Sequence, residues 1–249
     1  MKENKYDEAQ FFEKYSAMTR SQDGLEGAGE WHALKEMLPG FNGKRVLDLG
    51  CGFGWHCQWA AAGGASQVLG IDISEKMIAR ARQLNAYADR VSYRVAALED
   101  YEYPAAAYDI VLSSLAFHYI PSFGEICSRI AATLKDGGVF IFSVEHPVFT
   151  AYGSQDWFYG EENTRMHWPV DRYFSDGRRD AVFLGENVVK YHRSLTSYVS
   201  ALLDNGFAIR DLVEPRPDPT MLDTVPDMAD ELRRPMMLII SATKKPYEP

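Results

Sequence analysis

Three glycines stand close together between an apolar run and a helical pattern, in the segment Asp48-Leu-Gly-Cys-Gly-Phe-Gly54. Glycine adopts a positive φ without steric cost, so this spacing lets a ligand lie directly against the backbone of a tight turn. The helix that follows the turn offers free backbone N–H groups at its start. Glycine turns are common, however, and taken alone this one is equally typical of a turn that binds nothing.

A second candidate is Asp72, at the end of the next apolar run, Leu69-Gly-Ile-Asp-Ile73. A carboxylate at this place can accept hydrogen bonds from the vicinal hydroxyls of a ribose. The competing interpretation is that Asp72 caps the helix that begins near Ser74. Because both features fall at adjacent strand ends, where open α/β sheets bind ligands, the two together favour a nucleoside site.

The residues around the glycines favour a nucleoside that carries no phosphate. A dinucleotide turn usually has the pattern Gly-x-Gly-x-x-Gly and points a helix N-terminus at a pyrophosphate. Here the third glycine comes one residue early, and Asp48 lies two residues before Gly50. A carboxylate disfavours a pyrophosphate and suits a cation. S-adenosylmethionine carries a ribose, an adenine, a sulfonium and an ammonium group, and it therefore fits this turn better.

Histidines follow two later apolar runs, in Leu115-Ala-Phe-His-Tyr119 and in Glu145-His-Pro147. Histidine ionises near neutral pH and can remove a proton from a methyl acceptor. His118 and His146 are therefore the candidate general bases, with Glu145 placed to orient or charge-balance a histidine. The alternatives are a hydrogen-bonded structural role for each histidine, and a transfer that needs only proximity.

Aromatic side chains are dense in the stretch 151–174, which has no clear periodicity. They are Tyr152, Trp157, Phe158, Tyr159, Trp168, Tyr173 and Phe174. Such rings supply buried area and π-faces, so the stretch favours an apolar or aromatic pocket for the acceptor. An insertion that packs its own small core explains the same composition.

Short apolar runs alternate with helical patterns along the chain, and these elements must position the candidate residues. Strands are predicted at 45–49, 67–73, 91–95, 108–113, 139–144, 207–213 and 236–242, and helices at 7–18, 29–38, 55–62, 74–85, 123–134 and 195–203. The alternation predicts an α/β fold with a doubly wound, mostly parallel sheet and right-handed crossovers. Residues 146–190 break the rhythm and are predicted to form an insertion or lid.

Four segments resemble the motifs of the class I S-adenosylmethionine-dependent methyltransferases, and within that class the small-molecule group. They are 46–54, 70–74, 108–114 and 134–140, which are similar to motif I, the acidic segment after it, and the motifs of strands four and five. The resemblance implies one Rossmann-like domain with a seven-stranded sheet whose last strand is antiparallel. It divides into an N-terminal helical lid (1–40), a cofactor-binding half (44–145), an insertion or acceptor lid (146–190) and a C-terminal helix with strands (191–249).

The resemblance also implies roles for individual residues toward the methionine and ribose of the cofactor. The turn at Gly50, Cys51 and Gly52 would lie along the methionine part, with Asp48 orienting the turn or the ammonium group. Asp72 would hold the ribose hydroxyls. The backbone of Ser113 would approach the cofactor amine, and Tyr15 and Arg20 would close over the cofactor from a lid helix, Arg20 pairing with its carboxylate.

The adenine contacts implied by the resemblance are less regular. Ile73 and Met77 would pack on the ring, and Leu98 would offer its N–H. The family often has Asp-Ala after the third strand, where this chain has Ala97-Leu98. A contact to the adenine amino group would therefore have to come from Glu99 or from a backbone carbonyl.

Composition sets limits on the function. The 249 residues carry a formal net charge of −9, which argues against nucleic-acid and membrane-surface partners. The three cysteines form no CxxC pair, and the six histidines show no metal-ligand spacing, so reduced thiols and no metal are expected. The N-terminus is too polar for a secretory signal, and no run approaches the roughly 18 apolar residues of a membrane span. These features predict a cytoplasmic protein.

We therefore expect an enzyme that transfers a methyl group from S-adenosylmethionine to a small-molecule acceptor, aromatic or apolar, by in-line displacement. Its second product would be S-adenosylhomocysteine. Three alternatives stay open at this point: an RNA or protein methyltransferase on the same fold, a nicotinamide-dependent oxidoreductase, and a cofactor-binding protein without transferase activity.

Overall fold

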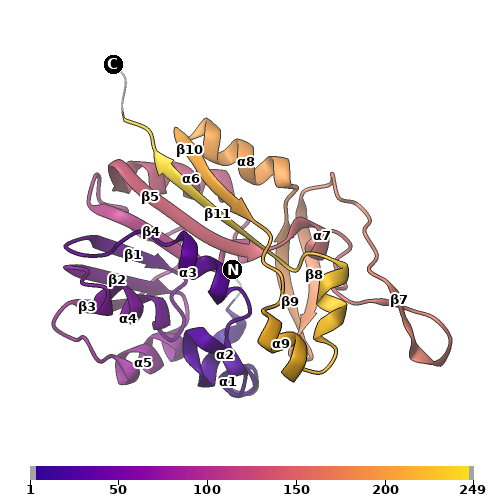
Figure 1. Ribbon diagram of the computed structural model, residues 1–249. Coiled ribbons are helices and arrows are strands. Elements are labelled where there is room, and N and C mark those ends of the chain that lie inside the picture. The colour runs from indigo at the N-terminus through magenta and orange to yellow at the C-terminus, as the bar shows by residue number, and fades with distance from the viewer. Residues whose placement is uncertain (1–3, 247–249) are drawn as a thin grey trace.

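The computed structural model describes residues 4–246 and is built around a seven-stranded sheet with the order β10-β11-β5-β4-β1-β2-β3 (Figure 1). The strands are β1 Arg45–Leu49, β2 Gln67–Asp72, β3 Val91–Val95, β4 Tyr108–Ser114, β5 Leu134–Glu145, β10 Phe207–Val213 and β11 Met237–Lys244. Only the pairings made by β11 are antiparallel in this sheet. The predicted fold, with its antiparallel last strand, is confirmed.

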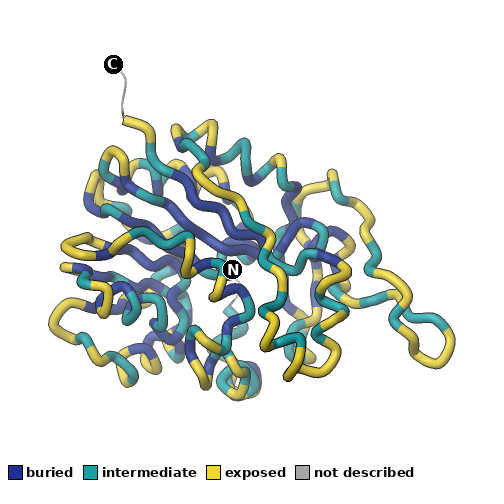
Figure 2. The backbone as a smooth tube through the Cα atoms, in the orientation of Figure 1, coloured by how far each residue is buried: buried dark blue, intermediate teal, exposed yellow. Residues whose placement is uncertain are grey.

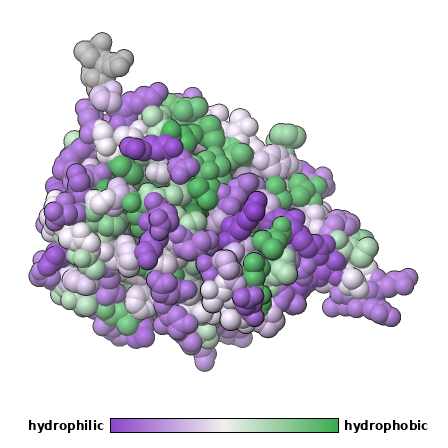
Figure 3. Space-filling model, viewed as in Figure 1, coloured by the Kyte–Doolittle hydropathy of each residue, from purple (hydrophilic) through white to green (hydrophobic). Residues whose placement is uncertain are grey.

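Helices cover both faces of the sheet. They are α1 Ala9–Ser16, α2 Thr19–Gln22, α3 Trp31–Met37, α4 Trp55–Ala62, α5 Glu75–Leu84, α6 Phe123–Thr133, α7 Pro147–Thr150, α8 Leu195–Asp204 and α9 Pro219–Thr224. The central strands have no polar face because both faces are covered, which explains their continuous apolar runs. Figure 2 shows the sheet as the buried centre of the molecule. The face of the molecule seen in Figure 3 is largely hydrophilic, with apolar side chains gathered near β10 and β11.

Two predicted boundaries differ from the structure. The helix predicted at 7–18 is shorter in the structure, where α1 spans Ala9–Ser16. It is preceded by a separate 3-10 turn, η1 Lys5–Asp7. The glycines after α6 lie inside β5, which begins directly at Leu134 and shifts its register against β4 before Val139. The positive φ of Gly137 (72°) accommodates this bulge, so the glycines bend a strand and do not end the helix.

The stretch 146–190 was predicted to break the rhythm of strands and helices as an insertion or lid. The structure shows that this stretch contains regular helices and strands. It holds α7, the hairpin of β6 Phe158–Tyr159 with β7 Arg165–His167, and most of the hairpin of β8 Gly177–Phe183 with β9 Glu186–His192. Side chains of β8 and β9 do alternate between buried and exposed, but several of the buried ones are polar, namely Arg179, Lys190 and His192. Hydrophobic periodicity fails here because charged side chains occupy the inward positions.

The N-terminal segment joins the sheet to the β8–β9 hairpin. Asp7 accepts hydrogen bonds from the Ser74 hydroxyl (2.6 Å) and the Lys76 backbone N–H (3.1 Å) at the start of α5. On the other side, Phe11 of α1 packs against Ala181 and Val188 of the hairpin. α1 is therefore held between two parts of the chain that are distant in sequence. Within residues 4–246, no helix is both long and apolar enough to cross a membrane.

Candidate active site

A cavity of about 460 Å³ lies at the carboxyl ends of the central strands, which is an ordinary size for a small-molecule site. Its walls come from the N-terminal helices, the loops after β1, β2, β3, β4 and β5, and the β8–β9 hairpin. The cavity brings together these predicted site residues: Tyr15, Arg20, Gly50, Gly52, Asp72, Ile73, Met77, Leu98, Glu99, His118 and Glu145.

The glycine turn has the backbone that its sequence predicts. Gly50, Gly52 and Gly54 have φ values of 75°, 52° and 78°. A Cβ added at Gly50 would lie 2.5 Å from the Cβ of Ala116, and one at Gly54 would lie 2.2 Å from the hydroxyl of Tyr93. At Gly52 an added Cβ would meet nothing within 4 Å. Two of the glycines are thus required by packing, and the third borders open space in the cavity.

Asp72 combines a structural contact with exposure to the cavity. Its Oδ2 accepts the Gly52 N–H and its Oδ1 accepts the Ser74 N–H, both at 2.9 Å. Burial raises the pKa of the carboxyl group above its usual value. Each carboxylate oxygen has a further lone pair, so the two backbone contacts leave room for hydrogen bonds from a ligand. The predicted helix-start role and the predicted ligand role are therefore compatible.

Three predicted cofactor residues do not line this cavity. Asp48 is buried beneath the turn, where it accepts the Cys57 thiol (3.2 Å) and where burial raises its pKa to about 7. Ser113 donates its hydroxyl to the Leu49 carbonyl at 2.7 Å, and its neighbour Ser114 faces the cavity instead. Cys51 borders only an adjoining hollow of about 50 Å³.

Arg20 has a partner that the sequence did not reveal. Its Nη2 lies 3.2 Å from Oε1 of Glu30, which also accepts the Ser114 hydroxyl at 3.0 Å. Burial opposes ionisation of Glu30, but the Arg20 guanidinium and the hydrogen bonds to the carboxylate together outweigh it and lower the pKa of this carboxyl. An acidic residue in the first turn of a predicted helix is ordinary, so Glu30 gave no signal of its own.

Glu145 lies at the cavity end of β5 and is held by two side chains from outside the sheet. Lys190 places its Nζ 2.5 Å from Oε1, and Gln155 donates its Nε2 to Oε2 at 2.6 Å. Gln155 also accepts the Lys190 ammonium at 2.7 Å. Burial opposes ionisation of Glu145, but the Lys190 ammonium and the hydrogen bonds from Lys190 and Gln155 together lower its pKa. Sequence analysis missed Lys190 because a lone lysine usually lies at the surface.

His118 is buried beside Glu145. Its Nδ1 accepts the backbone N–H of Glu145 at 3.4 Å, so the neutral ring carries its proton on Nε2. Burial lowers the pKa of His118 to about 4, which keeps the ring neutral at physiological pH. In this tautomer the ring donates a hydrogen bond from Nε2 and does not accept a proton there.

The shifted pKa of His118 makes stability depend on pH. The unfolded chain takes up a proton at this histidine near pH 6.5, whereas the folded protein resists protonation until about pH 4. Folding stability is therefore lost as the pH falls through this window, by about 3 kcal/mol from His118. His118→Asn is expected to reduce the loss measured by urea unfolding at pH 6.5 and pH 4. The same change at exposed His32 should leave it unaltered, and equal losses in both variants would contradict the argument.

His146 does not reach the cavity lining. Its Nδ1 accepts the Val148 N–H (3.0 Å) at the start of α7, and its Nε2 lies 2.8 Å from Oε1 of Glu214. Both ring nitrogens are therefore engaged in holding the chain around Pro147, which is the structural alternative considered for this residue.

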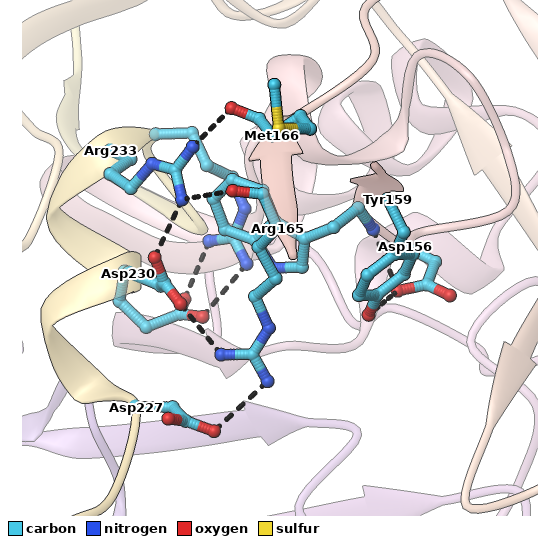
Figure 4. Close-up of polar contacts among 10 residues, drawn as sticks. Asp156, Tyr159, Arg165, Met166, Asp227, Asp230 and Arg233 are labelled. Carbon is cyan, nitrogen blue, oxygen red and sulfur yellow. Dashed lines mark hydrogen bonds and ion pairs between the residues drawn. The ribbon is translucent and has the colours of Figure 1, made fainter. Parts of the chain in front are cut away.

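Within residues 4–246, none of the seven aromatic side chains predicted for the acceptor pocket lines the cavity. Two of them, Trp157 and Trp168, belong to a separate cluster in which Trp168 stacks on Phe149 (4.8 Å between centroids) and the Arg234 guanidinium lies 4.2 Å above the Trp168 ring. Three others, Tyr152, Phe158 and Phe174, are exposed. Figure 4 shows how the same region is tied to the 3-10 turn η5 Met228–Arg233, with Arg165 reaching toward Asp227 and Asp230. The insertion packs its own core, and the prediction of a pocket there was wrong.

The aromatic wall of the cavity comes from other elements. Tyr6 of η1, Tyr119 after β4, and Phe183 and Tyr191 of the β8–β9 hairpin line it. The hydroxyls of Tyr6 and Tyr119 lie 3.2 Å apart. These rings were not singled out in the sequence because they are scattered along the chain.

Comparison with known proteins identifies relatives over nearly the whole chain. The family described as "Methyltransferase domain" matches residues 47–142. Two crystal structures match. One is described as a "putative S-adenosylmethionine dependent methyltransferase" from Listeria monocytogenes (56% identity, 89% of this chain and 99% of that one, TM-score 0.85). The other is described as an S-adenosylmethionine-dependent methyltransferase from Mesorhizobium loti (43% identity, 88% and 100%, TM-score 0.82).

A curated relative of named activity matches over a shorter region. The ubiquinone biosynthesis O-methyltransferase of Aromatoleum aromaticum is 36% identical over 45% of this chain, and the match spans 49% of that protein. This chain is therefore similar to about half the length of that relative.

Proposed function

The chain belongs to the S-adenosylmethionine-dependent methyltransferase family, and from that premise we propose that it methylates a small-molecule acceptor held in the cavity described above. One observation carries the proposal. A single cavity reaches from Asp72 at the end of β2 to Glu145 at the end of β5, with β1 and β4 between them. Three strand spacings amount to about 14 Å, so a nucleoside and a second small molecule can lie side by side.

The residues on the β2 side fit the cofactor. Gly52 presents bare backbone to open space, and Asp72 keeps lone pairs for the ribose hydroxyls. We place Ile73, Met77 and Leu98 against the adenine. S-adenosylmethionine supplies an electrophilic methyl group on its sulfonium when it is bound.

Arg20 and Tyr15 border the cavity from the N-terminal helices, and we place them over the methionine end of the cofactor. The Arg20 guanidinium is shared with Glu30, whose Oε2 has no hydrogen-bond partner among residues 4–246. A carboxylate of the ligand would therefore share Arg20 with Glu30 and would not have a free cation to itself. This arrangement provides both signs of charge for a zwitterionic amino-acid group.

The residues on the β5 side would orient the acceptor. His118 donates from Nε2, and the Glu145 carboxylate accepts hydrogen bonds on its remaining lone pairs. We therefore assign proton acceptance to Glu145 and acceptor positioning to His118, which reverses the roles expected from sequence. Positioning beside the sulfonium reduces the entropic part of the barrier for an in-line displacement.

Methyl transfer from isotopically labelled S-adenosylmethionine tests the proposal. Purified protein is incubated with a fractionated cell extract, and the label is followed by mass spectrometry in the small-molecule, protein and RNA fractions. We expect label in small molecules, in an amount that falls when Glu145→Ala or His118→Ala replaces the wild type. Label confined to protein or RNA would overturn the proposal.

A further inference from the structure

The charged groups at the acceptor end of the cavity are neutralised within the protein. Glu145 is paired with Lys190, whose side chain is only 2% exposed and whose ammonium contacts both Glu145 and Gln155. His118, the next polar group, is uncharged at neutral pH because burial lowers its pKa. The other charged lining residues are also paired or lie toward the proposed cofactor end. Asp72 ends β2, Glu99 follows β3, Arg20 pairs with buried Glu30 at 3.2 Å, and Lys5 pairs with Glu8 at 2.8 Å.

The Lys190 end of the Glu145–Lys190 pair is buried, whereas Glu145 faces the cavity. The Lys190 ammonium lies 5.3 Å from the Phe183 ring centroid and 5.9 Å from that of Tyr119, so apolar faces surround it. The same two rings line the cavity. A buried ion pair of this kind resists the removal of either partner, because the remaining charge would be left unpaired.

We propose that the Glu145–Lys190 pair makes the acceptor end of the cavity selective for uncharged acceptors. The inference rests on the proposed function, since it concerns the molecule placed beside the cofactor. A carboxylate or phosphate acceptor would meet no free cation among the aromatic walls, and an ammonium acceptor would meet no free anion. Either ion would have to be desolvated without a counter-ion or would have to compete with the internal pair. A neutral acceptor with a hydroxyl group can use the Nε2 donor of His118 and the oxygens of Glu145.

Substitutions at the pair predict opposite changes of preference. Glu145→Gln leaves the Lys190 ammonium unpaired and should favour anionic ligands. Lys190→Met leaves the Glu145 carboxylate unpaired and should favour cationic ligands. The double variant has neither charge, so its preference should again be for uncharged ligands. Recovery of that preference would show that the single variants act through charge and not through damage to the fold.

Ligand-observed NMR on protein saturated with S-adenosylhomocysteine can measure this preference. The probes are para-hydroxybenzamide, para-hydroxybenzoate and para-hydroxybenzylamine, which share a ring and a hydroxyl and differ in charge. Wild type should bind the amide at least about tenfold more tightly than either ion, and each single variant should shift its preference toward the predicted ion by a similar factor. Lys14→Met, which breaks the half-buried Lys14–Glu186 pair (3.1 Å) at the tip of the same hairpin, should leave the preference unchanged.

Two outcomes would overturn the inference in different ways. Equal affinities of the wild type for all three probes, or variants that keep the wild-type order, would show that the pair does not select by charge while the proposed function stands. Binding of S-adenosylhomocysteine with no binding of any probe would reject this end of the cavity as the acceptor site, and the proposed function would fail with it.

Discussion

Replacing Asp72 with alanine is expected to lower the affinity for S-adenosylhomocysteine about 10- to 100-fold, or about 1.5–3 kcal/mol. The variant loses the hydrogen bonds assigned to the ribose hydroxyls. It also frees the Gly52 and Ser74 N–H groups, which Asp72 holds at 2.9 Å, so the turn keeps only its backbone hydrogen bonds to Ile71 of β2. Isothermal titration calorimetry with the purified variant measures the change directly.

Two further variants sharpen this experiment. Asp72→Asn keeps one carbonyl oxygen and removes the negative charge, so its affinity should lie between those of wild type and Asp72→Ala. Asp89→Ala removes a carboxylate that is exposed and paired only with neighbouring Arg90 at 3.2 Å, and it should bind as wild type does. Unchanged affinity in a folded Asp72→Ala protein would remove Asp72 from the cofactor site.

Substitutions in the glycine turn are expected to separate folding from binding. Gly50→Ala should lower the free energy of unfolding by about 2–5 kcal/mol, because it combines a positive φ of 75° with a 2.5 Å approach to the Cβ of Ala116. Gly52→Ala bears the φ strain of about 1–2 kcal/mol without the clash. Its new methyl group enters the cavity, so it should impair cofactor binding more than stability.

Urea unfolding and calorimetry, applied to the same proteins, check this separation. Gly124→Ala is the matched control, because Gly124 lies in α6 and an added Cβ there meets nothing within 4 Å. That variant should be as stable as wild type or more stable by up to about 1 kcal/mol. A Gly52→Ala protein that binds S-adenosylhomocysteine with wild-type affinity would show that the cofactor does not lie against this residue.

The lining of the cavity at the ends of β1 and β2, where we propose that the cofactor binds, could be predicted from sequence because its determinants are local. Gly50, Gly52 and Asp72 follow directly on strands whose apolar runs are unmistakable, and parallel strands bring their carboxyl ends to one edge. The central strands could be predicted because both faces of the sheet are covered, so each strand is a continuous apolar run in the sequence. Even the helix-capping alternative for Asp72 proved to be a real contact, with Ser74.

The acceptor side could not be predicted in this way because its contacts join distant segments. Glu145 contacts Lys190, which lies 45 positions later in the sequence, and glutamate and lysine usually lie at the surface, so neither residue type indicates a buried ion pair. The β8–β9 hairpin buries Arg179 and Lys190. Its side chains alternate between buried and exposed, but hydrophobic and polar residues do not alternate in the same way, so hydrophobicity did not predict the strands. The conspicuous aromatic stretch misled because rings that pack on each other, such as Phe149 and Trp168, have the same composition as rings that face a ligand.

The hairpin that supplies Phe183, Lys190 and Tyr191 pairs only with itself and adds no strand to the central sheet. It also lies outside residues 47–142, the part of the chain that matches the methyltransferase family. Under the proposed function, the central sheet holds the methyl donor, and a hairpin outside that sheet contributes to recognition of the recipient. Substitutions confined to the cavity-facing side chains of the hairpin are therefore expected to change which recipients are accepted and to leave the residues proposed for the donor unaltered.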